Sequence, residues 1–223
     1  DLCRFVDIST SEVFGVNADR VAETDATPVG PVGEPRWAYA VSKLAAEHLC
    51  HMAHHDEGLK VVSLRPFNVF GPGQLGEGAV HRFIADALCG GPLRVHNDGS
   101  QIRAWCYIDD FIDALLCALI RPAAVGQTFH IGHPGNSVTV LELARRIADR
   151  VNPGLAIIHE PKGGVDVDFR IPDITAAQQV LGFVPSIHLD EGLRRTIDWY
   201  RESGHTHQAC VESAMHNMGP TRS

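Results

Sequence analysis

The chain has 223 residues, 44% hydrophobic and 21% charged, so it can bury a core of ordinary size. Its formal net charge of −8, with no basic cluster, argues against a nucleic-acid partner. No apolar run approaches the ~20 residues that cross a bilayer, and the N-terminus lacks a signal-peptide pattern. We therefore expect a cytoplasmic protein with no membrane partner, whose six cysteines are reduced and mainly buried thiols.

The first predicted element is a buried parallel strand over residues 4–10, which ends in polar side chains. Ser9, Thr10 and Ser11 carry hydroxyls, and Glu12 adds a carboxylate. Open α/β sheets bind ligands at the carboxyl ends of their strands, so these side chains are candidate site residues. The alternative is that the hydroxyls only cap backbone groups in a turn.

After a predicted surface loop over residues 16–36, the pattern indicates a helix over residues 37–55. Tyr39 and Lys43 lie four residues apart on it, so they share one face, one turn apart. A phenol beside an ammonium is a plausible acid/base unit, because a nearby cation favours the ionised phenol. The same spacing also occurs by chance on many helices, so the pair indicates a function only together with the neighbouring motifs.

Three histidines, His48, His51 and His55, share one face of the same predicted helix. Their spacing could suggest a metal, but no carboxylate or thiolate set is spaced to complete a site. We therefore expect a solvated or dimer-facing helix surface and no metal.

A predicted strand over residues 61–65 ends at Pro66, because proline cannot donate a hydrogen bond within a central sheet. Asn68 follows in the turn. An amphipathic helix is predicted over residues 78–89, and a short strand over residues 93–96.

The segment 101–110 combines an arginine with two adjacent carboxylates. Arg103 is a candidate for binding phosphate, which a planar guanidinium with five donors suits, and the alternative is a surface ion pair. Asp109 and Asp110 look like a catalytic pair, but they directly precede the apolar run 111–116. Capping of a helix N-terminus is the better interpretation.

The remaining chain alternates predicted strands and helices. The predicted elements are a strand over 127–132, a helix opening with the capping box Thr139-Val140-Leu141-Glu142 and running to Val151, a strand over 155–159, a helix capped by Asp173, and a helix over 189–203. Residues 205–223 show no periodicity and predict a frayed tail.

Three of these segments, in this order, carry a family resemblance: residues 8–15 (ISTSEVFG), 37–43 (WAYAVSK) and 61–72 (VVSLRPFNVFGP). They resemble the extended short-chain dehydrogenase/reductase family, specifically its NAD-dependent nucleotide-sugar epimerases, dehydratases and decarboxylases. The resemblance covers residues 4 to about 201, although the family tyrosine after Val13 is replaced by Phe14.

The resemblance implies an α/β fold, with a parallel Rossmann-type sheet and a smaller α/β substrate-binding domain. We expect a partial NAD-binding domain over 1–72 and 102–135, a nucleotide-sugar-binding domain over 73–101 and 136–204, and a tail over 205–223. The glycine-rich turn that places a pyrophosphate at a helix N-terminus is not found in the sequence. We therefore expect the N-terminal βαβ half of the family fold to be absent.

The resemblance also implies a role for each candidate residue. The catalytic residues would be Thr10, Glu12, Tyr39 and Lys43; the NAD-binding residues would be Ser9, Tyr39, Lys43, Pro66 and Val69; and the substrate-binding residues would be Thr10, Asn68, Arg103 and Arg170. Tyr39, tuned by Lys43, would remove the 4-OH proton of the sugar, which Thr10 hydrogen-bonds, while NAD⁺ oxidises C4. Asn68 and the two arginines would hold the nucleotide diphosphate.

We therefore predict a nucleotide-sugar epimerase/dehydratase that acts through a 4-keto intermediate, in a homodimer formed through the Tyr39/Lys43 helix. A UDP-glucuronate-type decarboxylase is the alternative within the family, and the acid at Glu12 fits dehydration and decarboxylation better than epimerisation. From another class, the rival is a non-catalytic fragment or dimerisation scaffold that cannot bind NAD alone.

Overall fold

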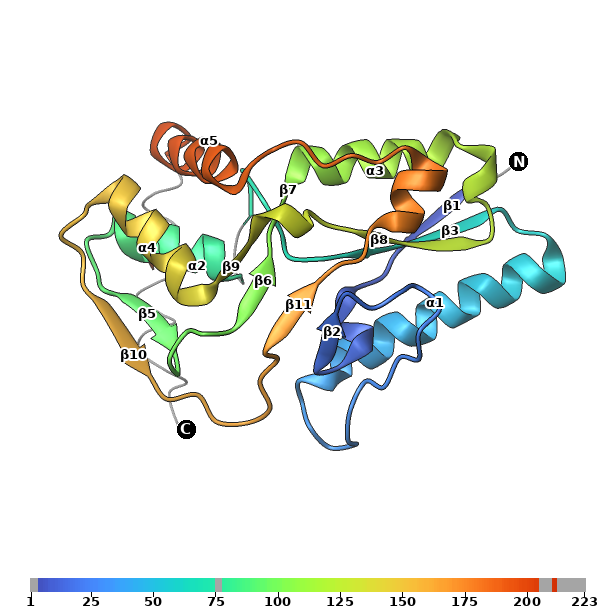
Figure 1. The fold of residues 1–223 in the computed structure, drawn as a ribbon, viewed down its shortest axis with the longest axis horizontal. Coiled ribbons are helices and arrows are strands. Elements are labelled where there is room, and N and C mark those ends of the chain that lie inside the picture. The colour runs from blue at the N-terminus through green and yellow to red at the C-terminus, as the bar shows by residue number, and fades with distance from the viewer. Residues whose placement is uncertain (1–3, 75–77, 205–209, 212–223) are drawn as a thin grey trace. The chain divides into compact units, whose positions relative to one another are not determined.

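The computed structural model describes residues 4–74, 78–204 and 210–211 (Figure 1). It divides into two compact units. Unit 1 comprises Asp1–Val69, Ile102–Ser137 and Val165–Ile187, and unit 2 comprises Phe70–Gln101, Val138–Gly164 and His188–Ser223. The sequence prediction had assigned all of 136–204 to the second domain, whereas Val165–Ile187 lies in unit 1.

Unit 1 is built on a parallel three-stranded sheet in the order β1-β3-β8. Its strands are β1 (Phe5–Ile8), β3 (Val61–Pro66) and β8 (Gln127–Ile131). Helix α1 (Trp37–Glu57) and helix α3 (Ile108–Ile120) lie on opposite sides of this sheet (Figure 1). The parallel strands with covering helices confirm the predicted α/β class.

The two faces of this sheet differ in chemistry. The face under α3 is apolar: Leu64 and Phe129 pack in one buried cluster with Ala114 and Ala118 of the helix. Since side chains alternate along a strand, the intervening residues face α1, and Arg65 is one of them. Helix α1 ends at Gly58, whose φ of 71° is a left-handed conformation that glycine adopts without strain.

A second parallel set of strands explains why Val165–Ile187 belongs to unit 1. Strand β11 (Phe169–Ile171) pairs with β2 (Asn17–Asp19) on one side and with β6 (Ile102–Ala104) on the other. Strand β2 lies within the stretch that composition predicted to be a surface loop. Part of that stretch is therefore ordered by pairing with a strand about 150 residues later, which no local pattern can indicate.

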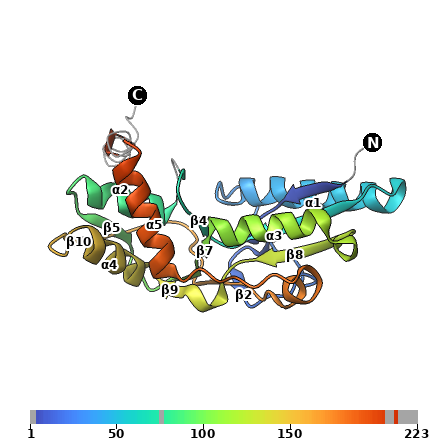
Figure 2. The same cartoon turned by 90° about the horizontal axis from the view of Figure 1, so that it is seen from above.

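Unit 2 pairs β5 (Leu93–His96) with β10 (Ile157–Glu160) in parallel. Its helices are α2 (Ala79–Leu88), α4 (Val140–Val151) and α5 (Leu189–Glu202), and α2 packs against α4 and β5 (Figure 2). Thr139 caps α4 as predicted, because its Oγ1 accepts a hydrogen bond of 3.0 Å from the backbone N–H of Glu142.

Short elements complete the described chain. They are η1 (Ser11–Phe14), β4 (Val69–Phe70), β7 (Cys106–Tyr107), η2 (Pro122–Ala124), η3 (Pro134–Asn136), β9 (Ser137–Thr139) and the π-helical turn η4 (Ala177–Leu181). Within the described ranges, no helix has the length and apolar character needed to cross a membrane.

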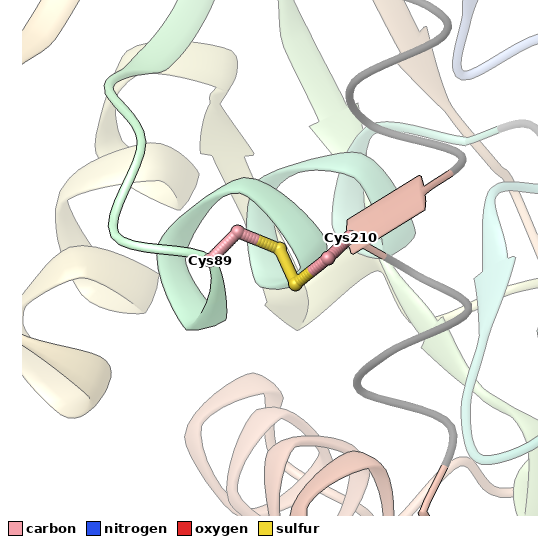
Figure 3. The surroundings of a disulfide bond; sticks show 2 residues. All are labelled: Cys89 and Cys210. Carbon is pink, nitrogen blue, oxygen red and sulfur yellow. A yellow bond between two sulfur atoms is a disulfide. The ribbon is translucent and has the colours of Figure 1, made fainter.

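Cys89 and Cys210 form a disulfide in unit 2, with their Cα atoms 5.6 Å apart (Figure 3). The expectation that all six cysteines are reduced is therefore wrong for this pair. A separation of 121 residues gives no recognisable spacing, and only the fold brings the two side chains within bonding distance. Cys50, Cys106 and Cys117 are free thiols, and Cys3 lies outside the described residues. So does the predicted tail, apart from residues 210–211.

Candidate functional site

The site is built at the carboxyl end of β1, where the strand passes into the short helix η1. Thr10 is the N-cap of η1, and its Oγ1 accepts a hydrogen bond of 3.2 Å from the N–H of Glu12. Gly15 ends the turn with φ of 60°, and a Cβ there would lie 2.3 Å from the Pro28 carbonyl oxygen. Thr10 therefore caps a backbone N–H group, as the alternative interpretation of the hydroxyls predicted. Its own O–H hydrogen remains available to donate.

Helix α1 brings Lys43 over the end of this strand. The Lys43 Nζ donates a hydrogen bond of 2.8 Å to the carbonyl oxygen of Ile8, two residues before Thr10. The same Nζ lies 6.0 Å from the centroid of the Tyr39 ring, and Tyr39 is 52% exposed. An ammonium has three N–H donors, so two of them remain for other partners. The tyrosine and lysine therefore share one helix face at the ligand-binding end of the sheet.

Arg170, from β11, lies beneath η1. Its guanidinium approaches Glu12 Oε1 at 3.4 Å and donates to the Gly15 carbonyl oxygen at 3.2 Å. Burial lowers the pKa of Arg170 to about 10, Glu12 opposes this shift, and the positive charges of Arg103 and Arg36 reinforce it. Arg170 thus contacts the Glu12 carboxylate, and the charges of Arg103 and Arg36 act on Arg170.

Asn68 and Arg103, the other two predicted diphosphate-binding residues, contact the chain's own backbone. Asn68 has a left-handed φ of 43°, and its Nδ2 donates to the Ala104 carbonyl oxygen at 3.2 Å. Arg103 donates to the Ile102 carbonyl oxygen at 3.0 Å and lies 3.8 Å from Asp166. Burial lowers the pKa of Arg103, and Asp166 opposes the shift. The ion pair considered for Arg103 therefore exists, but it is largely buried.

A buried ion pair that the sequence analysis missed joins α1 to the sheet. Arg65 Nη2 lies 2.6 Å from Glu47 Oε1, and Arg65 Nε donates to Glu47 Oε2 at 3.1 Å. Two signals in the sequence could have indicated it: Glu47 follows Lys43 by one helical turn, and Arg65 interrupts an apolar strand.

Two expectations about charged residues are corrected by the structure. His51 does not face solvent with His48 and His55, because its Nε2 lies 3.2 Å from Ser63 Oγ in the sheet. Asp110 does not cap α3, whose N-cap is Tyr107. Its carboxylate instead accepts backbone N–H groups of residues 186 and 187, at 2.9 and 3.1 Å, so it anchors a loop. Among the described residues, no three His, Cys, Asp or Glu side chains are grouped to hold a metal ion.

Comparisons with known proteins agree on one protein family. Residues 1–132 match the model of the NAD dependent epimerase/dehydratase family. The chain is 32% identical to a UDP-N-acetyl-alpha-D-glucosaminuronate decarboxylase of Bacillus cytotoxicus over 203 residues, which are 87% of this chain and 62% of the relative. It is 32% identical to a dTDP-glucose 4,6-dehydratase of Xanthomonas campestris pv. campestris, over 90% of this chain and 58% of the relative.

A solved structure of UDP-glucuronic acid 4-epimerase from Bacillus cereus in complex with NAD superimposes with a TM-score of 0.79 at 29% identity. The match covers 90% of this chain and 62% of the epimerase chain. The chain therefore spans about 60% of the length of the proteins that it resembles.

Proposed function

The chain belongs to the NAD dependent epimerase/dehydratase family, and on that premise we propose that the protein is an NAD-dependent nucleotide-sugar epimerase/dehydratase. It would act through a 4-keto sugar. The observation that supports this most directly is the bond from Lys43 Nζ to the Ile8 carbonyl oxygen, at 2.8 Å. This bond fixes Lys43 two residues from Thr10, and the Lys43 Nζ lies 6.0 Å from the centroid of the Tyr39 ring, which supports a shared role of the phenol, the ammonium and the hydroxyl.

The residues assigned to NAD fit a hydroxyl-rich ligand. Ser9 Oγ is buried near the Glu47 carboxylate, which it helps to keep ionised, and Lys43 keeps two further N–H donors. A hydroxyl and an ammonium at one strand end are suited to a ribose, whose hydroxyls can both donate and accept hydrogen bonds. Pro66 ends β3, which pairs with β1 up to Ile8 and Leu64, and Val69 begins β4. When bound, NAD⁺ supplies the two-electron oxidation of the alcohol carbon.

The chain's own residues would then manage the protons. Thr10, whose oxygen already accepts the Glu12 N–H, donates its remaining hydrogen and orients the sugar 4-OH. The Tyr39 oxygen takes the proton of that 4-OH, and the Lys43 ammonium stabilises the negative charge on the phenol. The resulting ketone acidifies the neighbouring C–H. Glu12, which is partly exposed at the start of η1, would move a second proton.

Decarboxylation of a UDP-glucuronate-type substrate is the second candidate, and the arginine cluster favours it. Oxidation at C4 of a uronate gives a β-keto acid, which loses CO₂ readily. Arg170 lies 3.4 Å from Glu12, the charges of Arg103 and Arg36 act on Arg170, and guanidiniums suit carboxylates as well as phosphates. The same cluster could hold a diphosphate, so the products decide between the two reactions.

We also propose that a second copy of the chain packs on α1. Val41, Leu49 and Met52 lie on one face of this helix and are 54%, 70% and 53% exposed. An apolar stripe of this kind is unusual on the free surface of a monomer. Leu49→Asp should convert a dimer to a monomer in analytical ultracentrifugation, and a monomeric parent protein would refute this part of the proposal.

The location in the cytoplasm stays a prediction. Disulfides such as Cys89–Cys210 are typical of oxidising compartments.

The function is tested by incubating the protein with NAD⁺ and UDP-glucose, dTDP-glucose or UDP-glucuronate, and identifying the products by mass spectrometry and NMR. Loss of CO₂, loss of water, or an unchanged mass with an inverted centre separates the three reactions. Tyr39→Phe should abolish turnover while the nucleotide sugar still binds. Ser42→Ala is a matched control, since it removes a hydroxyl that bonds the Tyr39 carbonyl oxygen in the same turn.

The rival interpretation, a scaffold that cannot hold NAD, is tested by calorimetric titration of this chain with NAD⁺. Micromolar binding would exclude the rival, in which the chain cannot bind NAD alone. Normal turnover by Tyr39→Phe would refute the proposed base.

A further inference from the structure

A polar layer separates α1 from the sheet of unit 1, where most α/β proteins place apolar side chains. In the first row across the sheet, Asp7 pairs in register with Ser63, and Ser63 pairs with Thr128. Two residues further along the strands, Arg65 pairs with His130. Since strand side chains alternate, all five side chains point to the same face, the one that α1 covers.

Successive turns of α1 meet these rows in order. His51 Nε2 lies 3.2 Å from Ser63 Oγ and 3.1 Å from Thr128 Oγ1, over the first row. Glu47 binds Arg65 of the second row through both carboxylate oxygens, and its Oε1 also accepts a hydrogen bond of 3.2 Å from Thr128 Oγ1 of the first row. Lys43 then reaches the Ile8 carbonyl oxygen at the strand end. Four helix residues rise ~6 Å and two strand residues ~6.6 Å, so the two repeats match.

Such a layer can fix the axial position of a helix in a way that an apolar interface cannot. Apolar contact is non-directional, so close packing alone specifies the axial position of a helix less strictly than hydrogen bonds do. A charged hydrogen bond is directional, and a buried carboxylate moved away from its guanidinium loses its compensation. Burial raises the pKa of Glu47, but the Arg65 bonds and charge outweigh it and lower the pKa below its ordinary value of 4.5. Glu47 is therefore ionised at neutral pH.

Arg65 also contacts the part of the site that follows β1, at the end of η1. Its guanidinium lies 5.0 Å from the centroid of the Phe14 ring, at the end of η1, and its Nη1 donates to the Glu23 carbonyl oxygen at 3.1 Å. One buried side chain thus touches the helix that carries Tyr39 and Lys43, and the short helix that follows Thr10.

We propose that the buried Glu47–Arg65 pair sets the register of α1 on the sheet, and thereby places Lys43 and Tyr39 relative to Thr10. Both are positioning residues, because they act through Lys43 and Tyr39 and not on the reacting atoms. The proposal deepens the proposed function and rests on it for its catalytic consequence. The register itself is measurable without any cofactor or substrate.

The test replaces both charges with apolar side chains of similar length, in Glu47→Met/Arg65→Met. Replacing a whole buried ion pair in this way is often neutral or stabilising, and the lost bonds to the Glu23 carbonyl oxygen and the Thr128 hydroxyl offset such a gain, so the thermal midpoint should stay near that of the parent. The readout is acetylation of lysine followed by mass spectrometry. The chain has three lysines, and the exposed Lys60 and Lys162 serve as internal references for Lys43.

In the double variant, the Glu47–Arg65 bonds no longer set the register of α1, so Lys43 should lose its bond to Ile8 and acetylate several-fold faster relative to Lys60 and Lys162. The matched control is Arg94→Met/Glu160→Met, which removes an ion pair in unit 2 and should leave Lys43 unchanged. A folded double variant with parental Lys43 labelling overturns the proposal. If the double variant does not fold, Glu47→Asp decides instead: it keeps the charge one methylene shorter, and unchanged Lys43 labelling in it also overturns the proposal.

With an active parent protein, the double variant should lose roughly 100-fold in kcat, as expected for a misplacement of about 1 Å, with little change in KM. A purely structural role would lower the thermal midpoint and leave both the labelling and kcat of the folded protein unchanged. If the parent turns over none of the three nucleotide sugars, the proposed function fails, while the labelling still decides the register.

Discussion

The stability of the protein should fall on mild acidification, and His130 should cause a measurable part of the loss. The His130 ring is fully buried on β8, 5.3 Å from the ring centroid of Phe14 and 5.2 Å from that of Phe67. Its Nε2 lies 3.5 Å from Arg65 Nη1, and because a guanidinium only donates, this nitrogen must accept. Burial, reinforced by the charge of Arg65, lowers the pKa of His130 from 6.5 to about 4.

The direction in which pH changes the stability follows from this lowered pKa. A histidine kept neutral in the fold contributes stability that is fully present above pH 6.5 and is lost as the pH falls towards about 4. Near pH 5 the unfolded chain carries the proton and the folded chain does not. Between about pH 7.5 and about pH 5, the free energy of unfolding should therefore fall by about 2 kcal/mol through His130 alone.

The assay is urea unfolding of the parent and of His130→Gln at both pH values. Glutamine offers an acceptor to Arg65 but does not titrate. Burial raises the pKa of Glu23, which acts in the opposite direction on acidification, but Glu23 is present in both proteins and cancels in the comparison. The parent should lose about 2 kcal/mol more than the variant. Equal losses in the two proteins would refute a neutral, buried His130.

Three further outcomes concern stability. In urea unfolding, Phe129→Ala should lower the free energy of unfolding by about 3 to 5 kcal/mol, because Phe129 is fully buried in the cluster under α3. The control Val184→Ala, at an exposed position, should change it by less than about 0.5 kcal/mol. Thr139→Ala should cost about 1 kcal/mol by the same assay, and Thr139→Ser should restore most of it, since either hydroxyl can cap α4. Dithiothreitol should lower the thermal midpoint of the parent but not that of Cys89→Ser, because the Cys89–Cys210 bond closes a long loop in the unfolded chain; equal sensitivity to dithiothreitol would contradict this bond.

The order and type of most elements could be predicted from the sequence. The apolar run of β3 ends at Pro66, the amphipathic pattern of α4 follows a capping threonine, and α1 carries Tyr39 and Lys43 on one face. These features depend on neighbours within one or two turns, so a local pattern contains them. The family resemblance rested on the same kind of short segment, and the matched family confirms it.

Tertiary structure decided the features that depend on residues far apart in the sequence. Strand β11 joins β2 across about 150 residues, and Cys89 meets Cys210 across 121. The polar layer under α1 arises because strand register places Arg65 beneath Glu47, two residues that look unremarkable in isolation. Periodicity reports which face a side chain takes, but not which partner lies opposite. The partner of a side chain depends on how the strands pair and on where a helix packs, and those contacts form only in the folded chain.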